Sequence, residues 1–479
     1  MSDDLRRVHF VAIAGTGMGS LAALLHARGL TVTGSDDQLY PPMSTLLARA
    51  GIPVRESFRA ENVLDAAPDL VVIGNAVRPD NPEARAAIDE GFAYRSFSDA
   101  LYELAIAGRH PVVVTGTHGK TTTTSLVTYL LRETGADPSM LVGGFAHDFD
   151  GSFLEGGGAH FVVEGDEYDT AFFDKTPKFL HYHPRTLVIT SVEFDHADIY
   201  RDLDHVKEAF RTLVARMPAD GTIVAATGHP NVRDVVADAP CRVVGYGVGA
   251  ADALPGTDWR ADDLVADEAG TRFTLHRPGA APTPVTSSQH GDFNVENALA
   301  ALAVVDALGG DADAAVRALP AFRGVKRRQE VRGEADGVLV VDDFAHHPTA
   351  VAASIGAARA RHPGRPIVAI FEPRTNTSRR AVFQQRYAEC FDQADRVIVR
   401  AVPDAPIYSA TGEVTERFSA ARLVDDLSAR GVPAVACDEV DEIVALLARE
   451  ARPGDVLLVM SNGDFGGIWE KLLRALEAR

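Results

Sequence analysis

The hydrophobic positions of this chain fall into short continuous runs, separated by longer stretches with helical spacing. Continuous apolar runs are typical of strands buried on both faces, and their alternation with helices predicts parallel sheets covered by helical layers. Changes in this pattern divide the chain into three blocks, residues 1–108, 109–322 and 323–479. We therefore expect three α/β domains, of which the first and third are Rossmann-like and the second contains a mainly parallel sheet.

Each block supplies its own set of expected elements. In the first block the expected strands are Val8–Ile13, Thr31–Thr33 and Leu70–Ile73, and the helices are Leu21–Arg28, Ser44–Ala50 and Pro82–Glu90. In the second, the strands are Val112–Val114, Phe161–Val163, Leu187–Ile189 and Ile223–Ala225, followed by a small antiparallel region over Trp259–Ser288 and helices over Val295–Leu308 and Ala312–Leu319. In the third, the strands are Val338–Val341, Ile367–Phe371, Arg396–Val399, Ala434–Ala436 and Val456–Met460.

Composition narrows the class of protein. The 479 residues are 46% hydrophobic and 24% charged, as expected for a globular protein with several cores. A formal net charge of −20 argues against a nucleic-acid or anionic-membrane partner, although a few basic side chains can still bind an anionic substrate. The three cysteines, Cys241, Cys390 and Cys437, form no CxxC pair, and no signal-peptide or membrane-spanning pattern is present, so we expect a cytoplasmic protein. The oligomeric state is left open.

The most specific chemical motif is the glycine-rich loop Gly116-Thr117-His118-Gly119-Lys120-Thr121, between the strand Val112–Val114 and a predicted helix Ser125–Glu133. Its glycines allow backbone N–H groups to face phosphate oxygens, Lys120 would reach the β- and γ-phosphates, and Thr121 would bind Mg²⁺. Val114 stands where the first glycine of the longer GxxxxGK[ST] motif belongs, and an incidental turn is the alternative. The flanking elements favour ATP hydrolysis in a central domain of the P-loop ATPase type.

Two polar segments follow strands of the same predicted sheet and should open at the same edge as the phosphate loop. They are Glu164-Gly165-Asp166-Glu167-Tyr168-Asp169 and Glu193-Phe194-Asp195-His196-Ala197-Asp198. Carboxylates and imidazole at strand ends suit a divalent cation, and ordinary acidic surface is the alternative.

A second glycine-rich turn, Gly15-Thr16-Gly17-Met18-Gly19, follows the first strand, and Gly34-Ser35-Asp36 ends the second. The pattern is similar to a dinucleotide fingerprint and indicates a diphosphate at a helix N-terminus. An NAD-dependent dehydrogenase is therefore one rival hypothesis, and a nucleotide-binding regulator is another. A dehydrogenase would leave the phosphate loop without a purpose, and the ATP and metal motifs disfavour both hypotheses.

Taken together, the motifs resemble those of the Mur ligases of peptidoglycan synthesis, and the resemblance covers essentially the whole chain. Besides the phosphate loop with Thr122 and the two acidic motifs, it rests on Gly324-Val325-Lys326-Arg327-Arg328-Gln329-Glu330 and Asp342-Asp343-Phe344-Ala345-His346-His347-Pro348. It implies a ligase that uses ATP and Mg²⁺ to activate a carboxylate as an acyl phosphate, which an amine then attacks.

The resemblance also implies the roles of individual residues. UDP-N-acetylmuramate would be bound by Gly15, Thr16, Gly17, Met18, Gly19, Ser35, Asp36 and Asn75, so the first turn would not bind NAD. ATP would be bound by Gly116, Thr117, His118, Gly119, Lys120, Thr121, Thr122, Asn294, Asn297, Arg328 and Asp343. The metal would be held by Thr121, Glu164 and His196, and the incoming murein peptide by His346, His347 and Arg374. The catalytic set would be Lys120, His196, Arg328 and His347, with His346 or His347 either deprotonating the amine or orienting its neighbours.

Members of this family that act on UDP-N-acetylmuramate add either L-alanine, in synthesis, or the recycled tripeptide L-alanyl-γ-D-glutamyl-meso-diaminopimelate. The chain resembles the tripeptide-adding members at Tyr40-Pro41-Pro42-Met43-Ser44, Tyr168–Lys175, Glu193–Asp198, Glu372-Pro373-Arg374-Thr375-Asn376-Thr377 and Met460-Ser461-Asn462-Gly463. Alanine-adding members usually carry a His-Arg-Tyr-Thr-Arg run after the corresponding proline, where this chain has Arg374-Thr375-Asn376-Thr377-Ser378. Tripeptide ligation is therefore the leading hypothesis and L-alanine ligation the alternative.

Two positions depart from the family pattern. Phe293 stands where the motif GxHNxxN has its histidine, which weakens the adenine-side assignment of Asn294 and Asn297. Arg211 stands where several members have a carbamylated lysine, and Lys207 is out of register, so we expect no carbamylated lysine there.

Overall fold

The computed structural model describes residues 5–75, 77–169, 176–251, 254–402, 406–407, 409, 412, 414 and 416–479. Residues 170–175 of the stretch Tyr168–Lys175 lie outside the described residues. The chain forms two compact units. One consists of Met1–Val192, Lys207–Arg260 and Asn297–Gly324, and the other of Glu193–Val206, Ala261–Glu296 and Val325–Arg479.

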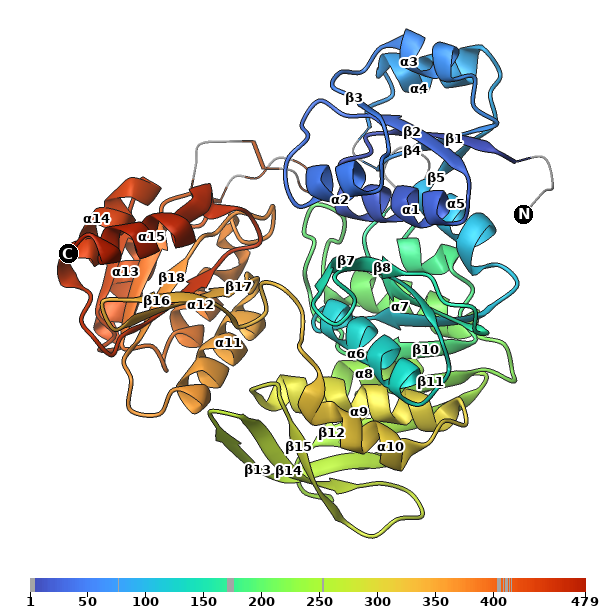
Figure 1. Cartoon of the computed structure of the whole chain (residues 1–479). Coiled ribbons are helices and arrows are strands. Elements are labelled where there is room, and N and C mark those ends of the chain that lie inside the picture. The colour runs from blue at the N-terminus through green and yellow to red at the C-terminus, as the bar shows by residue number, and fades with distance from the viewer. Residues whose placement is uncertain are drawn as a thin grey trace. The chain divides into compact units, whose positions relative to one another are not determined.

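The first unit begins with a five-stranded parallel sheet of order β3-β2-β1-β4-β5. Helices α1, α2 and α5 cover one face and α3 and α4 the other (Figure 1). The strands are β1 (Arg7–Val11), β2 (Thr31–Ser35), β3 (Val54–Arg55), β4 (Leu70–Ile73) and β5 (Tyr94–Ser96), and the helices are α1 (Thr16–Ala27), α2 (Met43–Arg49), α3 (Ala60–Ala66), α4 (Pro82–Asp89) and α5 (Phe97–Leu101). This order confirms the Rossmann-like prediction for the first domain.

Differences from the predicted elements have local causes. β1 ends at Val11 because Ala12 adopts φ +66°, which is outside the strand region. Helix α1 already begins at Thr16, directly after the glycine turn, so its first turn faces the site. The sequence did not predict β3 and β5, because these edge strands are short and only partly buried.

The central sheet in the first unit contains strands in the order β12-β11-β10-β6-β9-β7-β8, parallel except for the antiparallel pair β7–β8. Its strands are β6 (His110–Thr115), β7 (Ser139–Ala146), β8 (Gly151–Leu154), β9 (His160–Gly165), β10 (Thr186–Ile189), β11 (Thr222–Ala225) and β12 (Arg242–Val248). Its helices are α6 (Lys120–Glu133), α8 (Pro230–Val236) and α10 (Ala312–Ala318), and α7 (Leu203–Ala215) and α9 (Asp292–Ala307) complete the middle of the chain. Since β10, β6 and β9 are neighbours, their carboxyl ends share one sheet edge.

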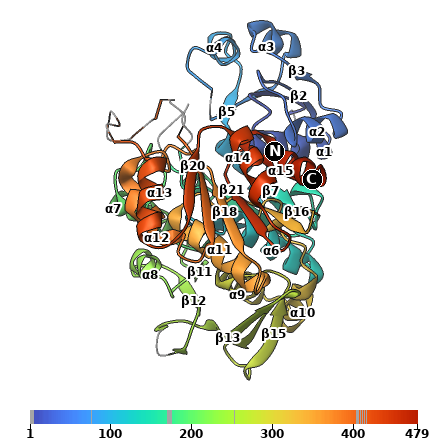
Figure 2. The same ribbon diagram turned by 90° about the vertical axis from the view of Figure 1, so that its left-hand side faces the viewer.

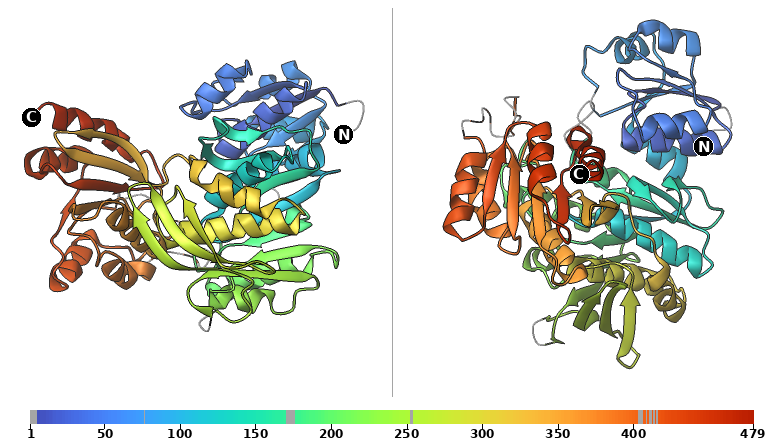
Figure 3. Two further views of the ribbon diagram at one scale, coloured as in Figure 1. Left: turned by 60° about the horizontal axis from the view of Figure 1, so that its bottom comes forward. Right: turned by 60° about the vertical axis from the view of Figure 1, so that its left-hand side comes forward.

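Strands β13 (Trp259–Asp267), β14 (Gly270–His276) and β15 (Thr283–Ser287) form the expected antiparallel region, seen in yellow-green in Figure 3. Thr271–Leu275 of β14 pairs antiparallel with Thr283–Ser287 of β15, which confirms the prediction. The antiparallel region was predictable because glycine and proline residues mark the turns between its short strands.

The last part of the second unit is a six-stranded sheet of order β16-β17-β21-β18-β19-β20, in which only β16 is antiparallel to its neighbour. The strands are β16 (Glu330–Ala335), β17 (Val338–Asp343), β18 (Ile367–Phe371), β19 (Arg396–Arg400), β20 (Ala434–Cys437) and β21 (Val456–Met460). The helices are α11 (Pro348–Arg361), α12 (Gln384–Cys390), α13 (Ala420–Ala429), α14 (Val440–Glu450) and α15 (Ile468–Glu477) (Figure 2).

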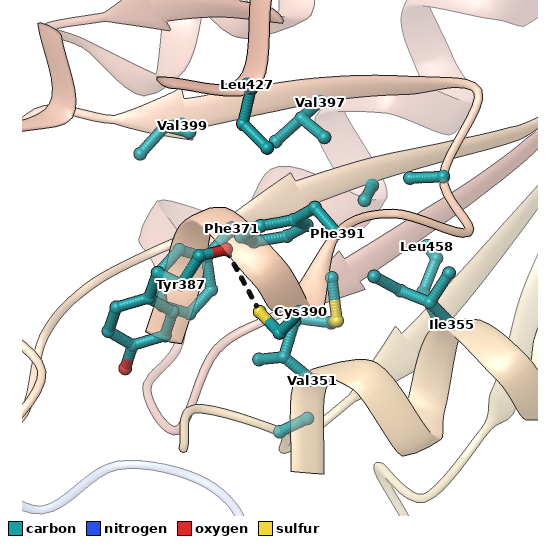
Figure 4. Packing of buried hydrophobic residues seen from close by; sticks show 14 of the residues in the cluster. Val351, Ile355, Phe371, Tyr387, Cys390, Phe391, Val397, Val399, Leu427 and Leu458 are labelled. Carbon is teal, nitrogen blue, oxygen red and sulfur yellow. Dashed lines mark hydrogen bonds between the residues drawn. The ribbon is translucent and has the colours of Figure 1, made fainter. Parts of the chain in front are cut away.

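Both faces of this last sheet are buried, which explains its continuous apolar strands. On one face α11, α12 and α13 pack against the sheet, and on the other α14 and α15 do so. Figure 4 shows Val351 and Ile355 of α11 in the same core cluster as the aromatic rings of Phe371 and Phe391. The Cys390 thiol lies in the same core, and burial raises its pKa well above the usual value. Among the described residues, no helix combines the length and apolar character needed to cross a membrane.

Candidate active site

The phosphate loop joins β6 to α6 and has a conformation that requires its glycines. Gly116 has φ +134° and Gly119 has φ +80°, both in the region that favours glycine. A Cβ on Gly116 would lie 2.1 Å from Thr190 Oγ1, and one on Gly119 would lie 2.6 Å from Asn297 Oδ1. The Lys120 ammonium turns back and donates a hydrogen bond to the Gly116 carbonyl at 2.8 Å. The loop therefore has the shape that brings backbone N–H groups and a lysine toward a polyphosphate.

Two residues directly after β10, Thr190 and Ser191, hold the phosphate loop through hydrogen bonds. Thr117 N donates to Ser191 O at 3.1 Å, and His118 N donates to Ser191 Oγ at 2.9 Å. Thr190 Oγ1 donates to the His118 carbonyl at 2.5 Å. Sequence reasoning did not assign Thr190 or Ser191, because a hydroxyl residue after a strand is too common to indicate such a contact.

Glu167 forms a buried ion pair with Lys120, with 2.7 Å between Oε2 and Nζ and side-chain exposures of 2% and 11%. Burial lowers the pKa of Lys120, but the carboxylates of Glu167, Asp166 and Glu164 outweigh it and raise that pKa above its usual value. Lys120 is therefore charged at working pH. Glu167 is part of a motif that sequence analysis identified, but its contact with Lys120 was not predicted.

Glu164 ends up beside Thr121, as expected for two ligands of one metal. Thr121 Oγ1 donates to Glu164 Oε1 at 2.9 Å, and Gly143 N donates to Oε2 at 2.7 Å. Burial and the nearby Asp166 raise the pKa of Glu164. A cation would relieve this unfavourable burial of negative charge, and hydroxyl and carboxylate oxygens are ligands that Mg²⁺ prefers. The residues present therefore fit Mg²⁺.

The two asparagines assigned to the adenine side have different surroundings. Asn297 accepts a hydrogen bond from Thr123 Oγ1 at 2.9 Å and lies directly behind Gly119. In the other unit, Asn294 Nδ2 donates to the His290 carbonyl at 2.8 Å, while the Phe293 ring packs beside Gly291. The structure thus places Asn297 against the phosphate loop. Thr122 is buried in the first turn of α6.

A cavity of about 960 Å³ adjoins the first glycine turn. Of the predicted sugar-nucleotide residues, Gly15, Thr16, Gly17, Met18, Asp36 and Asn75 line it. Glu164 of β9, together with Asp166 and Lys178 from the segment that follows this strand, lines the same cavity. The glycine turn and the Glu164 carboxylate, the predicted metal ligand, therefore border one continuous space within the first unit.

Two predicted residues, Ser35 and Gly19, are not among the residues that line this cavity, and their role as ligands stays a prediction. Ser35 is fully buried at the end of β2 and donates its hydroxyl proton to Glu83. A Cβ on Gly19 would lie 2.9 Å from Met43 Sδ and 3.1 Å from the Ile13 carbonyl, so this glycine allows α1 to pack closely. The Asp36 carboxylate accepts hydrogen bonds from two backbone N–H groups and thereby shapes the turn.

In the second unit, the motif Asp195-His196-Ala197-Asp198 lies against the C-terminal domain. Thr377 Oγ1 lies 3.0 Å from Ala197 N and accepts its hydrogen bond, and Arg380 donates to the Ala197 carbonyl at 3.0 Å. His196 adopts φ +51°. The loop after β18, which carries the predicted peptide-binding Arg374, therefore directly contacts the motif that contains a predicted metal ligand.

His346 and His347 lie beside this motif. His346 Nε2 is 3.8 Å from Asp195 Oδ2. Burial alone would raise the pKa of Asp195. The adjacent His196, His346 and His347 together have the larger effect and hold this pKa well below its usual range. His347 is 1% exposed, accepts from Thr349 N at the start of α11 and contacts the Phe194 carbonyl through Nε2 at 3.2 Å. Since both ring nitrogens of His347 are engaged, the geometry favours an orienting role for it.

Asp343, Arg328 and Arg374 also lie in the second unit. The Asp343 carboxylate accepts from Gln329 N, Gln329 Nε2 and Ala345 N at 2.8–3.1 Å, so it holds the backbone around Arg328. The Arg328 guanidinium lies 4.5 Å from the centre of the Phe344 ring. Arg374 packs so closely on Gly463 that a Cβ there would lie 1.4 Å from its Nη1.

The position expected to lack a carbamylated lysine is part of an ion-pair cluster. Arg211 and Lys207 both contact the Asp234 carboxylate, at 3.0 and 3.1 Å. Arg211 is thus held by an acidic partner on a neighbouring helix.

Three family profiles match consecutive parts of the chain. They are described as "Mur ligase family, catalytic domain" over residues 7–109, "Mur ligase middle domain" over residues 114–305, and "Mur ligase, glutamate ligase domain" over residues 327–463. Together they span all three sheets.

Individual relatives match over nearly their whole length. The chain is 38% identical over 98% of both chains to the UDP-N-acetylmuramate–L-alanyl-γ-D-glutamyl-meso-2,6-diaminoheptandioate ligase of Escherichia coli (strain K12). It is 34% identical over 98% of both chains to the UDP-N-acetylmuramate–L-alanine ligase of Caldanaerobacter subterraneus. Its structure matches a murein peptide ligase from Psychrobacter arcticus with a TM-score of 0.73 and 33% identity over 99% of both chains. The alanine ligase of Thermotoga maritima matches with a TM-score of 0.78 and 26% identity over 98% of this chain and 99% of that one. The chain belongs to the Mur ligase family.

Proposed function

We propose that this protein joins the tripeptide L-alanyl-γ-D-glutamyl-meso-diaminopimelate to UDP-N-acetylmuramate in the cytoplasm, with conversion of ATP to ADP and phosphate. The observation that carries this proposal is the cavity shared by Gly15–Met18 and Glu164. A diphosphate at the N-terminus of α1 would leave the sugar end of the substrate pointing toward the carboxylate-activating residues. The sequence similarity to tripeptide ligases supports this choice of peptide.

The first step is the attack of the lactyl carboxylate on the γ-phosphate of ATP, which gives an acyl phosphate and ADP. Two anions approach each other in this step, so catalysis depends on compensating positive charge. Lys120 supplies one such charge at the phosphate loop, and Arg328 would supply another. Mg²⁺, held by Thr121, Glu164 and His196, would add further charge compensation when bound.

In the second step the amine of the peptide attacks the acyl carbon, and phosphate leaves. The amine must be neutral, so a group near it has to accept a proton. Both histidines have two ring contacts, but His346 is 23% exposed and His347 only 1%, so His346 is the more accessible candidate for this proton transfer. Arg374 would bind a carboxylate of the peptide, and its close packing on Gly463 would fix the orientation of the guanidinium.

L-alanine ligation is the second candidate, because alanine ligases match this chain over similar lengths. The two candidates share the first step and differ only in the amine. ADP release should be measured with UDP-N-acetylmuramate plus either the tripeptide or L-alanine. Stimulation of ADP release by the tripeptide supports the proposal, whereas stimulation only by L-alanine favours the alternative. Formation of NADH without ADP release would instead indicate a dehydrogenase.

A further inference from the structure

Lys178 lines the large cavity, although no motif of the sequence pointed to it. It is the first residue of the short 3-10 helix η2 (Lys178–His181), which lies between β9 and β10. Its side chain is only 10% exposed. A buried ammonium group is costly unless charges or hydrogen bonds compensate for the loss of water.

Within the described part of the chain, this charge is compensated only partly. Among the described residues, the ion-pair partner of Lys178 is Asp166, with 3.5 Å between Nζ and Oδ2. The ammonium also lies over two aromatic rings, 4.1 Å from the centre of Tyr168 and 5.4 Å from that of Phe97. An ammonium has three N–H donors, and neither a ring face nor a carboxylate at 3.5 Å satisfies them well. Lys178 thus retains donor capacity at the wall of the cavity.

Most charged residues of the cavity wall are acidic, so an anionic ligand needs a positively charged donor in order to bind there. The acidic members of the wall are Asp36, Asp37, Asp80, Glu164 and Asp166, and its basic members are Arg78 and Lys178. A sugar nucleotide carries its own negative charges into this acidic space. Each basic group therefore has a large effect on which anion can bind.

Lys178 also lies between the two ends of the proposed substrate site. Its neighbour Phe97 packs against Gly17, since a Cβ there would be 3.0 Å from the Phe97 ring. Its other neighbour, Asp166, follows Glu164 by two positions in the chain. Lys178 is thus connected to the glycine turn on one side and to the carboxylate-activating residues on the other.

We infer that Lys178 binds an anionic group of the sugar nucleotide directly. This inference rests on the proposed function, because it assumes that UDP-N-acetylmuramate occupies the cavity. The anion is either the diphosphate or the lactyl carboxylate, and both accept charge-assisted hydrogen bonds from an ammonium. The same contact would hold the lactyl end of the substrate in register with Glu164 and the phosphate loop.

The test is isothermal titration calorimetry with UDP-N-acetylmuramate and with UDP-N-acetylglucosamine, which has the diphosphate but no lactyl carboxylate. The variants are Lys178→Met, Lys178→Gln and Lys178→Arg. Lys207→Met is the matched control, because Lys207 is also largely buried and paired with an aspartate but lies on α7, away from the cavity. Loss of a charge-assisted hydrogen bond should weaken binding about 10- to 100-fold in the Met and Gln variants, with partial recovery in the Arg variant.

The two nucleotides distinguish the possible anions. Weaker binding of both assigns Lys178 to the diphosphate, and weaker binding of UDP-N-acetylmuramate alone assigns it to the lactyl carboxylate. Unchanged affinity for both nucleotides in Lys178→Met or in Lys178→Gln, with a folded protein by circular dichroism, overturns the inference. Wild-type protein that binds neither nucleotide refutes the proposed function, which is a separate outcome.

Discussion

The ion pair between Lys120 and Glu167 allows catalysis and folding to be tested separately. Replacing Lys120 with Met removes the ammonium that lies 2.7 Å from Glu167 and 2.8 Å from the Gly116 carbonyl. The Glu167 side chain, 2% exposed, then loses this counter-charge in the neighbourhood of Asp166 and Glu164. The substitution should therefore affect both the stability of the protein and its reaction with ATP.

The expected magnitudes differ for the two effects. Removal of one partner from a buried ion pair typically costs about 3–5 kcal/mol of folding free energy. We expect the loss in Lys120→Met to lie within this range. Adding Glu167→Gln should restore most of this stability. The catalytic effect should not recover, because the loss of a preorganised charge contact costs about 3–4 kcal/mol of barrier, or about 10²- to 10³-fold in kcat.

Urea unfolding measures the first effect, and a coupled assay of ADP release measures the second. Binding of UDP-N-acetylmuramate by calorimetry is the control, since Lys120 does not line the cavity and this affinity should stay within a few-fold of wild type. Near-normal ADP release by Lys120→Met would refute the role of Lys120. Recovery of kcat in Lys120→Met/Glu167→Gln would show that the single variant lost activity only because Glu167 had lost its counter-charge.

Three further predictions concern other parts of the molecule. Gly463→Ala should displace the Arg374 guanidinium and raise KM for the tripeptide about tenfold, while calorimetry shows unchanged binding of UDP-N-acetylmuramate. An unchanged KM would show that Arg374 does not bind the peptide. Gly119→Ala should weaken ATP binding and destabilise the fold by about 1–3 kcal/mol, because alanine must adopt φ +80° and meets Asn297; normal ATP affinity in equilibrium dialysis would contradict this. Burial and a neighbouring histidine hold the pKa of His110 at about 4, below the usual 6.5. The unfolded state therefore binds the proton more readily, so the free energy of unfolding should fall as the pH decreases from about 6.5 to about 4. Urea unfolding should show a smaller fall in His110→Gln, and an identical pH dependence would refute it.

The fold was largely predictable because most central strands are buried on both faces. Ile367–Phe371 and Val456–Met460 are continuous apolar runs, and the structure has strands at the same positions. β7 was not predicted, since glycines at 143 and 144 interrupt its apolar run. β16 was missed because it is a half-exposed edge strand with charged residues.

The geometry of the candidate site was predictable where one motif contains the residues, as in the phosphate loop, or where two motifs follow neighbouring strands, as for Thr121 and Glu164. It was not predictable where a contact joins residues far apart in the chain. The pairing of Lys120 with Glu167 and the support of His118 by Ser191 depend on the order of β10, β6 and β9, which local sequence does not encode. The hydrogen bond from Ser35 to Glu83 was not predictable, because a turn motif does not show on which side of its strand the hydroxyl lies.

In the proposed reaction, phosphoryl transfer activates the lactyl carboxylate before the peptide amine attacks it. Mass spectrometry of products formed from ATP, the tripeptide and UDP-N-acetylmuramate labelled with ¹⁸O in its carboxylate tests this claim directly. The expected products are UDP-N-acetylmuramoyl-tripeptide and inorganic phosphate that carries one ¹⁸O atom from the carboxylate. Unlabelled phosphate, released while UDP-N-acetylmuramate remains unchanged, would contradict this claim.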